Sequence, residues 1–443
     1  MLSSNLITSA LAAHNPPPHI YIGYSGGVDS HVLLHLCAAL PSLKPKITAV
    51  YIHHGLQAEA ESWGKHCEIT AQALAINFTM QRVHAHAKLG ESPEEAARNA
   101  RYHALKSLMG RDDVLLIGQH REDQLETVLL QLFRGSGLRG LSGMPASMTF
   151  GVGMLLRPLL NIPKQALDDY AKSQALQWIE DPSNQCSDYD RNFLRNNIVP
   201  ALKQRWPALD KTVARSARHC ADAALIIAEV ADELMPTVFN TDDNTLDINE
   251  LKTHLPYRQT LLIRQWFQCL GLKMPTQHSI GRLQAEVLAA REDSDPLVSA
   301  PGYCIRRYRN KLYCLPPDEP RTLLNTRWVK GQTSLAITRQ LTLSCQPSST
   351  GILREIWNNA SIEISWRNGG EKIRLPKRYG RHTLKKLFQE AGIPPWEREL
   401  IPLIYLDGKL AAIGERWISA EFYHEKTDEC LMLSNVYDTH SAT

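Results

Sequence analysis

The chain has 443 residues, 43% of them hydrophobic and 21% charged, with 49 Lys and Arg against 46 Asp and Glu. This length suffices for two to four domains with cores of their own, and the composition excludes a mainly disordered chain. No stretch approaches the roughly 18 consecutive apolar residues of a membrane span, and the amino terminus lacks a basic segment before an apolar one. We therefore expect a cytoplasmic protein with no membrane partner.

Residues 19–120 alternate short apolar runs with helical patterns. Strands are predicted at 19–24, 46–52, 77–83 and 113–118, because these runs are short, rich in Ile, Val and Leu, and bounded by turn residues. The segments between them have apolar residues at helical spacing. This alternation predicts a parallel α/β sheet covered on both faces, which binds its ligands at the carboxyl ends of the strands.

The rest of the chain divides by composition into further segments. The first domain is predicted to span 1–215, and a helical middle domain 216–317. Residues 318–355 are rich in Pro, Ser and Thr and have poor periodicity, which predicts a linker. Residues 356–443 are predicted to form a small α+β carboxyl-terminal domain.

Nine cysteines are scattered along the chain without a CxxC pair. Their odd number and spacing argue against a disulfide framework, a zinc ribbon and an iron–sulfur site. The pairs His53-His54 and His84-x-His86 lack carboxylates or cysteines at ligand spacing. We therefore expect no metal site built from protein ligands alone.

A glycine-containing loop follows the first predicted strand, with the sequence Ser25-Gly26-Gly27-Val28-Asp29-Ser30. Paired glycines allow a tight turn that exposes successive backbone N–H groups, and the two serines add hydroxyl donors at the start of a helix. Such a loop can bind a phosphate. The ordinary P-loop pattern, which ends in Gly-Lys-Ser or Gly-Lys-Thr, is absent from the chain.

A second polar segment follows the fourth predicted strand and contains Asp123-Gln124-Leu125-Glu126-Thr127. Asp123 and Glu126 are three residues apart, so both carboxylates project from one face of a helix. Two anions at this place suit a cationic ligand such as an amino-acid ammonium group. The same spacing is also how a helix caps its own start, and the spacing alone leaves both interpretations open. His120, beside this segment, could contact the ligand or support its neighbours.

The glycine-rich run 135–140 matches GxGxxG but follows a helix, so it lacks the context of a dinucleotide-binding loop. Arg134 and Arg139 lie among these glycines. The combination fits a loop that contacts phosphates or a tRNA backbone.

The Ser25–Ser30 string resembles the PP-loop of ATP pyrophosphatases, which split ATP into AMP and pyrophosphate. Together with 123–127, 181–184, 369–376 and 384–396, it resembles the tRNA(Ile)-lysidine synthetase family. The resemblance implies that ATP adenylates the C2 oxygen of the wobble cytidine in the CAU anticodon of tRNA(Ile). The ε-amine of L-lysine then displaces AMP. It also implies Mg²⁺ bound with ATP through Asp29.

The resemblance assigns roles to particular residues. The ATP-binding residues would be Ser25, Gly26, Gly27, Val28, Asp29 and Ser30. Asp123 and Glu126 would bind lysine, and Asp29 and Asp123 would be catalytic. Arg98 and Arg101 both align with a catalytic arginine of the family, and which of them is its counterpart stays open. Arg191 and Arg195 could both point toward phosphates of tRNA or ATP, or lie on a solvated helix surface.

The net charge of +3 conceals a basic segment. Residues 367–398 contain nine Lys and Arg against three Glu, a net of +6. Basic residues that contact phosphates provide affinity for nucleic acid, and the family assigns tRNA binding to this domain. The residues predicted to bind tRNA are Arg134, Arg139, Arg191, Arg195, Arg374, Lys377, Arg378, Lys385 and Lys386.

Two other functions are compatible with parts of the sequence. A tRNA thiolase would share the PP-loop, but the chain has no CxxC. A catalytically silent tRNA-binding protein would be free to lose both the phosphate loop and the 123–127 motif, and this chain has kept them. The sequence leaves open whether the protein is a homodimer.

Overall fold

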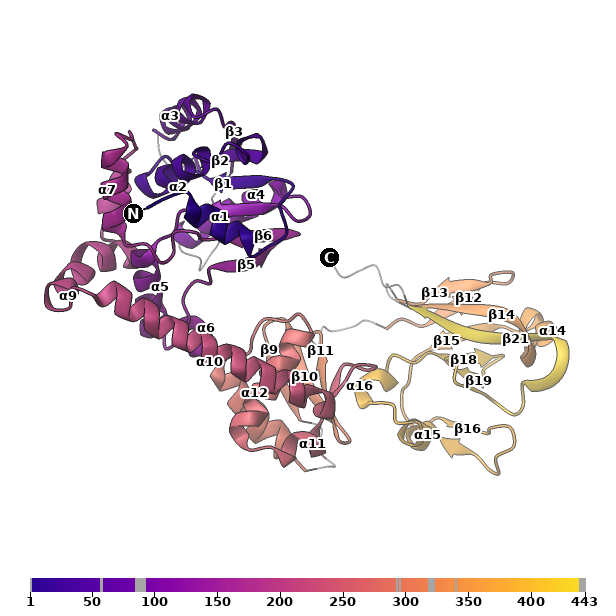
Figure 1. Cartoon of the computed structure of the whole chain (residues 1–443). Helices are drawn as coiled ribbons and strands as arrows, with labels where there is room; N and C mark the ends of the chain where they lie inside the picture. Colours follow the sequence, from indigo (N-terminus) through magenta and orange to yellow (C-terminus); the bar gives the residue numbers. More distant parts are fainter. Residues whose placement is uncertain are drawn as a thin grey trace. The chain divides into compact units, whose positions relative to one another are not determined.

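The structure is a computed structural model that describes residues 2–55, 59–83, 93–291, 294, 296–317, 323–338 and 341–437. It divides into two compact units, residues 1–233 and 234–443 (Figure 1). The division falls inside the long helix α10, Leu209–Val238. The boundaries predicted at 215 and 317 stay predictions.

The first unit contains a six-stranded sheet with the strand order β3-β2-β1-β4-β6-β5. All neighbouring strands are parallel except β5 and β6. The predicted parallel sheet is therefore confirmed, with an antiparallel strand added at one edge. The strands are β1 Ile20–Gly23, β2 Ile47–His53, β3 Asn77–Arg82, β4 Val114–Ile117, β5 Ser147–Phe150 and β6 Gly153–Leu156.

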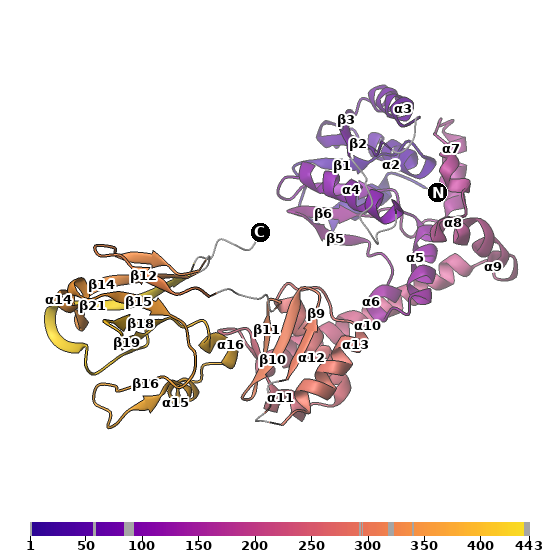
Figure 2. The same cartoon turned by 180° about the vertical axis from the view of Figure 1, so that it is seen from behind.

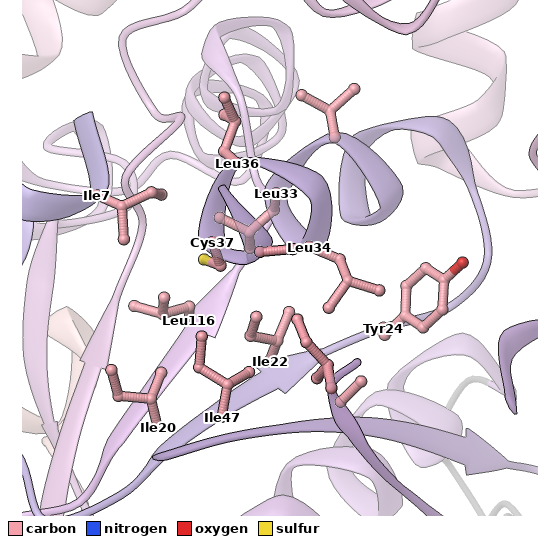
Figure 3. Close-up of a cluster of buried hydrophobic side chains, with 14 of the residues drawn as sticks. Ile7, Ile20, Ile22, Tyr24, Leu33, Leu34, Leu36, Cys37, Ile47 and Leu116 are labelled. Carbon is pink, nitrogen blue, oxygen red and sulfur yellow. The ribbon is translucent and has the colours of Figure 1, made fainter. Parts of the chain in front are cut away.

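Two helices cover opposite faces of this sheet. On one face, Leu33 and Leu34 of α2 (Val28–Ala38) are fully buried over Ile22 of β1 (Figure 3). Helix α4 (Pro93–Leu108) covers the other face (Figure 2). Its Leu105 packs in a separate cluster with Leu115 of β4. Strands buried on both faces explain why the sequence reads as nearly continuous apolar runs at these positions.

The first unit contains further helices before, between and after these strands. They are α1 Asn5–Ala12, α3 Ala60–Ala73, α5 Arg121–Phe133, α6 Leu138–Leu141, α7 Lys164–Ser173, α8 Asp190–Phe193, the π-helix η3 Leu194–Ile198 and α9 Val199–Arg205. Two short 3-10 helices are η1 Lys44–Lys46 and η2 Pro182–Gln185.

The second unit begins with a helical region and its own small sheet. Its helices are α11 Ile248–Thr253, α12 Pro256–Cys269, α13 Gln277–Arg282 and the π-helix η4 Leu283–Leu288. The five-stranded sheet has the order β7-β8-β11-β10-β9. Its strands are β7 Phe239–Asn240, β8 Thr245–Asp247, β9 Leu297–Ala300, β10 Tyr303–Tyr308 and β11 Lys311–Leu315.

The carboxyl-terminal part is built from antiparallel strands and short helices. One sheet has the order β12-β15-β18-β19-β20, a second β13-β14-β21, and β16 pairs with β17. The strands are β12 Thr326–Trp328, β13 Ser334–Ala336, β14 Leu341–Leu353, β15 Ile362–Ser365, β16 Lys372–Ile373, β17 His382–Thr383, β18 Leu403–Leu406, β19 Lys409–Ile413, β20 Trp417–Ile418 and β21 Tyr423–Tyr437. The helices are α14 Arg354–Asn359, α15 Leu384–Glu390 and α16 Pro395–Arg398.

The structure differs from the predicted linker at 318–355. Residues 326–353 carry β12, β13 and β14, and Leu343 and Ile352 are buried in the carboxyl-terminal core. The alternation of β14 is interrupted in its middle by the polar run Gln346-Pro347-Ser348, where the side chains are partly or fully exposed. This run gave the segment the composition of a linker, although its three residues are themselves paired with β21.

Within the described part of the chain, no helix is long and apolar enough to cross a membrane.

Candidate active site

The predicted phosphate-binding loop, Ser25–Ser30, connects β1 to α2 and is held by its own serines. Ser30 donates a hydrogen bond from Oγ to the Gly27 carbonyl at 2.9 Å, and its Oγ accepts from the Ser25 N–H at 3.2 Å. Gly26 has a φ of +83°, and a Cβ there would lie 2.5 Å from the Cδ1 atom of Ile179. Only glycine fits this position, and the turn leaves the first N–H groups of α2 without helical acceptors, as an anion site requires.

Asp29 lies in the first turn of α2 and already has cationic neighbours. The Lys164 Nζ atom lies 2.5 Å from one carboxylate oxygen, and the His120 Nε2 atom lies 3.5 Å from the other. Burial alone would raise the pKa of Asp29, but the hydrogen bonds and charges of His120 and Lys164 lower it below its usual value. Asp29 is therefore ionised at neutral pH.

The starts of α2 and α5 approach each other closely at Gly118. A Cβ on Gly118 would lie 2.9 Å from the Asp29 carbonyl oxygen. Gly118 follows β4 and Asp29 follows β1, and these strands are neighbours in the sheet. The absence of a side chain at Gly118 thus lets the phosphate loop and the segment 119–127 share one edge.

His120 is 4% exposed and lies among three carboxylates. Its ring nitrogens are 3.5 Å from oxygens of Asp29, Glu122 and Asp123. Burial alone would lower the pKa of His120, but the hydrogen bonds to Asp29 and Glu122 and the charge of Asp123 raise it to about 9. The charged ring therefore holds these acidic side chains together.

Asp123 both caps α5 and faces the cavity. Its Oδ2 atom accepts a hydrogen bond from the backbone His120 N–H at 3.0 Å, at the start of α5. Its Oδ1 atom accepts from Arg195 Nη2 at 3.1 Å. The capping interpretation of Asp123 is correct for Oδ2, while the carboxylate also lines the larger cavity.

Glu126, one turn later on α5, is 2% exposed and bound by two arginines. Arg195 donates to it from Nε at 2.7 Å and from Nη2 at 2.8 Å, and Arg191 donates from Nε at 3.0 Å. Arg191 also donates to the Thr127 hydroxyl at 2.9 Å. Both arginines are thus joined to the 123–127 motif.

Gln124 fixes the glycine-rich segment that follows α5. Its side-chain amide donates to the Met144 carbonyl at 3.0 Å and accepts from the Met144 N–H at 2.7 Å. Gly143 has a φ of +63°, and a Cβ there would lie 2.6 Å from the Gln124 Oε1 atom. Arg134 and Arg139, in this segment, have exposed side chains.

Two neighbouring cavities lie at this edge of the sheet. The larger one, ≈ 540 Å³, is lined by Ser25, Gly27, Asp29 and Ser30 of the phosphate loop, and also by Arg101, Asp123, Arg191 and Arg195. The second, ≈ 400 Å³, is lined by Arg98 as well as Arg101. The side chains predicted from two separate sequence segments are therefore brought together around one space. Glu126 lies behind its wall.

The chain is similar to known proteins over most of its length. A PP-loop domain matches residues 3–202, a TilS substrate binding domain matches 246–313, and a TilS substrate C-terminal domain matches 362–435. A tRNA(Ile)-lysidine synthase of Methylococcus capsulatus is 38% identical over 420 residues, which cover 94% of this chain and 96% of that protein. The chain belongs to the tRNA(Ile)-lysidine synthase family. The resemblance found in the sequence is thereby confirmed.

Further relatives and one solved structure extend the comparison. The tRNA(Ile)-lysidine synthase of Serratia proteamaculans is 39% identical over 420 residues, covering 93% of this chain and 95% of its own. A solved U34-tRNA thiolase from Methanococcus maripaludis covers 49% of this chain and 77% of its own, with 17% identity and a TM-score of 0.41. That score is too low to support an argument about function.

The remaining predicted residues of this family member lie in the second unit, around the β16–β17 hairpin. Arg374, Lys377, Arg378, Lys385 and Lys386 all have exposed side chains. Lys377 forms an ion pair with Glu425 at 2.7 Å, and Arg378 forms one with Glu390 at 2.9 Å. These two cations are partly neutralised within the protein.

The sequence analysis missed two lysines that contact carboxylates of the site. Lys164 contacts Asp29, and Lys203 lies 2.9 Å from a Glu122 oxygen. Lys164 immediately follows Pro163 at the start of α7, and a lysine near a helix start is uncommon because the helix dipole disfavours it there. The position of Lys164 at a helix start was the one signal in the sequence for its contact with a nearby anion.

Proposed function

We propose that this protein ligates L-lysine to the C2 carbon of the wobble cytidine of tRNA(Ile) with a CAU anticodon, with ATP as the activating substrate. The observation that carries this proposal is the shared cavity of ≈ 540 Å³, which the phosphate loop and Asp123 both line. An adenylating site and an acceptor for an ammonium group must face the same space if an activated base is to meet an amine.

In the first step, the C2 oxygen of the cytidine attacks the α-phosphorus of ATP and pyrophosphate leaves. The first N–H groups of α2 and the hydroxyls of Ser25 and Ser30 would bind the phosphates and stabilise the charge on the leaving group. We assign the catalytic arginine to Arg101, because it lines both cavities, whereas Arg98 lines only the second.

Mg²⁺ fits this site as an ion carried by the nucleotide. Among the residues the structure describes, no group of three or more His, Cys, Asp or Glu side chains could hold a metal ion. Mg²⁺ often binds one or two carboxylates together with substrate phosphates, and Asp29 offers one carboxylate in the first turn of α2. When bound, the ion would neutralise charge on the pyrophosphate.

In the second step, the ε-amine of lysine attacks C2 of the adenylated cytidine, the C2–O bond breaks, and AMP leaves with that oxygen. Asp123 would bind the α-ammonium group of lysine and orient the amine. Glu126 would act behind it, since its carboxylate is buried and its oxygens accept hydrogen bonds from Arg191 and Arg195.

A sulfur-transfer reaction is less compatible with the cavity, because none of its described lining residues is a cysteine. The tRNA body would be held by exposed cations outside the cavity: Arg134, Arg139, Arg374, Lys385 and Lys386.

The test is incubation of the purified full chain with ATP, labelled lysine and an unmodified tRNA(Ile) transcript with a CAU anticodon. We expect label in the RNA and AMP in equal amount. The same transcript with a GAU anticodon is the control and should stay unlabelled. Asp29→Asn should abolish AMP release while the protein stays folded. No label with folded wild-type protein, or equal label in both transcripts, would overturn the proposal.

A further inference from the structure

The second cavity, ≈ 400 Å³, is not used by the two reaction steps. It lies between α4 and the segment that contains α8 and η3. Four arginines line it, Arg98, Arg101, Arg191 and Arg195, together with Tyr189 and Asn192.

The charges of the two cavities differ. The larger cavity includes the carboxylates of Asp29, Asp123 and Asp181. The described lining of the second cavity contains no carboxylate at all. Arg191 pairs with Glu126, and Arg195 pairs with both Glu126 and Asp123, while Arg98 and Arg101 of α4 add two further cationic side chains to this lining. An anionic group is therefore favoured there.

Tyr189 supplies an aromatic surface on a rigid wall. Tyr189 precedes the first residue of α8 and is 39% exposed. Asn192, on the next turn, donates hydrogen bonds to the carbonyls of Ser183 and Cys186 at 3.0 and 2.9 Å and so ties the wall to the preceding loop. Arginines beside an accessible aromatic ring are typical of sites that bind single-stranded nucleic acid, where phosphates meet cations and bases stack.

The two cavities are contiguous, because Arg101, Asn184 and the arginines of η3 and α8 line both. A strand that places one nucleotide in the larger cavity would place its neighbour in the second. We propose that the second cavity binds the nucleotide next to the wobble cytidine, with its phosphate on Arg98 and its base against Tyr189. This inference rests on the proposed function and names a subsite for the same RNA.

The test uses an anticodon stem–loop RNA with the CAU anticodon and the full chain. Arg98→Ala and Tyr189→Ala should each weaken RNA binding about tenfold, because one phosphate contact or one stacked base is lost. Binding of a non-hydrolysable ATP analogue should change by less than about twofold. Lys106→Ala is the matched control, since Lys106 is an exposed cation on the same helix α4 and lines neither cavity; it should bind RNA like wild type.

Replacing the phosphates beside the cytidine, one at a time, by a neutral methylphosphonate shows which phosphate contacts Arg98. One of these replacements should weaken binding to wild type about tenfold but binding to Arg98→Ala less than about twofold. Equal losses in both proteins, or wild-type RNA affinity in both single variants, would overturn the subsite. If wild-type protein makes no lysidine on the unmodified tRNA, the proposed function fails instead, which is a separate result.

Discussion

Arg195 holds the buried carboxylate of Glu126 through two hydrogen bonds, at 2.7 and 2.8 Å. The two residues come from different helical segments, and Arg191 adds a third hydrogen bond to the same carboxylate. Burial alone would lower the pKa of Arg195, but the hydrogen bond and charge of Glu126 raise it above its usual value. Glu126 therefore joins α5 to the wall of the active site.

Removal of this carboxylate should destabilise the fold. Glu126→Ala removes the carboxylate shared by two partly buried guanidinium groups and leaves Arg195 with Asp123 and Arg191 with the Thr127 hydroxyl. We expect the free energy of unfolding to fall by about 2 kcal/mol. Urea denaturation measures it. Glu68→Ala is the control, because Glu68 pairs with the exposed Lys65 on the surface and should change the stability by less than about 0.5 kcal/mol. Equal losses in both variants would contradict this role of Glu126.

Asp123→Asn separates lysine binding from helix capping. Asparagine keeps an oxygen that can accept the His120 N–H, so α5 stays capped, but the negative charge is lost. We expect the KM for lysine to rise about tenfold or more, with a smaller fall in melting temperature than in Asp123→Ala, because the cap is kept while the charge beside His120 and Arg195 is lost. Asp123→Ala should lose both properties. An unchanged KM in Asp123→Asn would refute the lysine-binding assignment and leave capping as the function of this residue.

The stability of the first unit should depend on pH through Glu122. Burial alone would raise the pKa of Glu122, but hydrogen bonds from His120, Lys203 and the Lys164 N–H lower it from 4.5 to about 2. Because the pKa of this carboxyl group is lower in the folded than in the unfolded state, its ionised form stabilises the fold. The contribution is therefore complete above pH 4.5 and is lost as the pH falls toward 2.

Thermal unfolding of Glu122→Gln across this range measures the effect. At pH 7 the variant should be less stable than wild type by about 2 kcal/mol, and the difference should shrink steadily below pH 4.5. Glu68→Gln, at an exposed site, should give a curve parallel to that of wild type. A constant difference between Glu122→Gln and wild type at all pH values would be inconsistent with the ion pairs around Glu122.

The exposed lysines of α15, which follows the β16–β17 hairpin, should contribute to tRNA affinity. Lys385→Ala/Lys386→Ala should weaken tRNA binding and reduce the slope of log K against log salt by about two, one for each lost phosphate contact. Lys377→Ala/Arg378→Ala is the comparison, because these cations already pair with Glu425 and Glu390 and should change the slope less. An unchanged slope in the first variant would argue against phosphate contacts by α15.

Much of the fold and the outline of the site could be predicted from local patterns. The strands and the phosphate loop were predictable because apolar runs and paired glycines depend on nearby residues alone. The strand β14 was not, since Pro347 and its polar neighbours lie inside a strand whose pairing with β21 is distant in the sequence. The contacts of Arg191 and Arg195 with Glu126 were missed for the same reason, because they join residues 65 and 69 positions apart.

The most direct test of the central claim follows one oxygen atom. Transcripts with ¹⁸O at C2 of the wobble cytidine would be incubated with the protein, ATP and lysine, and the AMP examined by mass spectrometry. If the C2 oxygen is adenylated and lysine then attacks C2, each AMP should carry one ¹⁸O and the lysidine none. Unlabelled AMP, formed together with a lysine-modified tRNA, would contradict the adenylation of the cytidine.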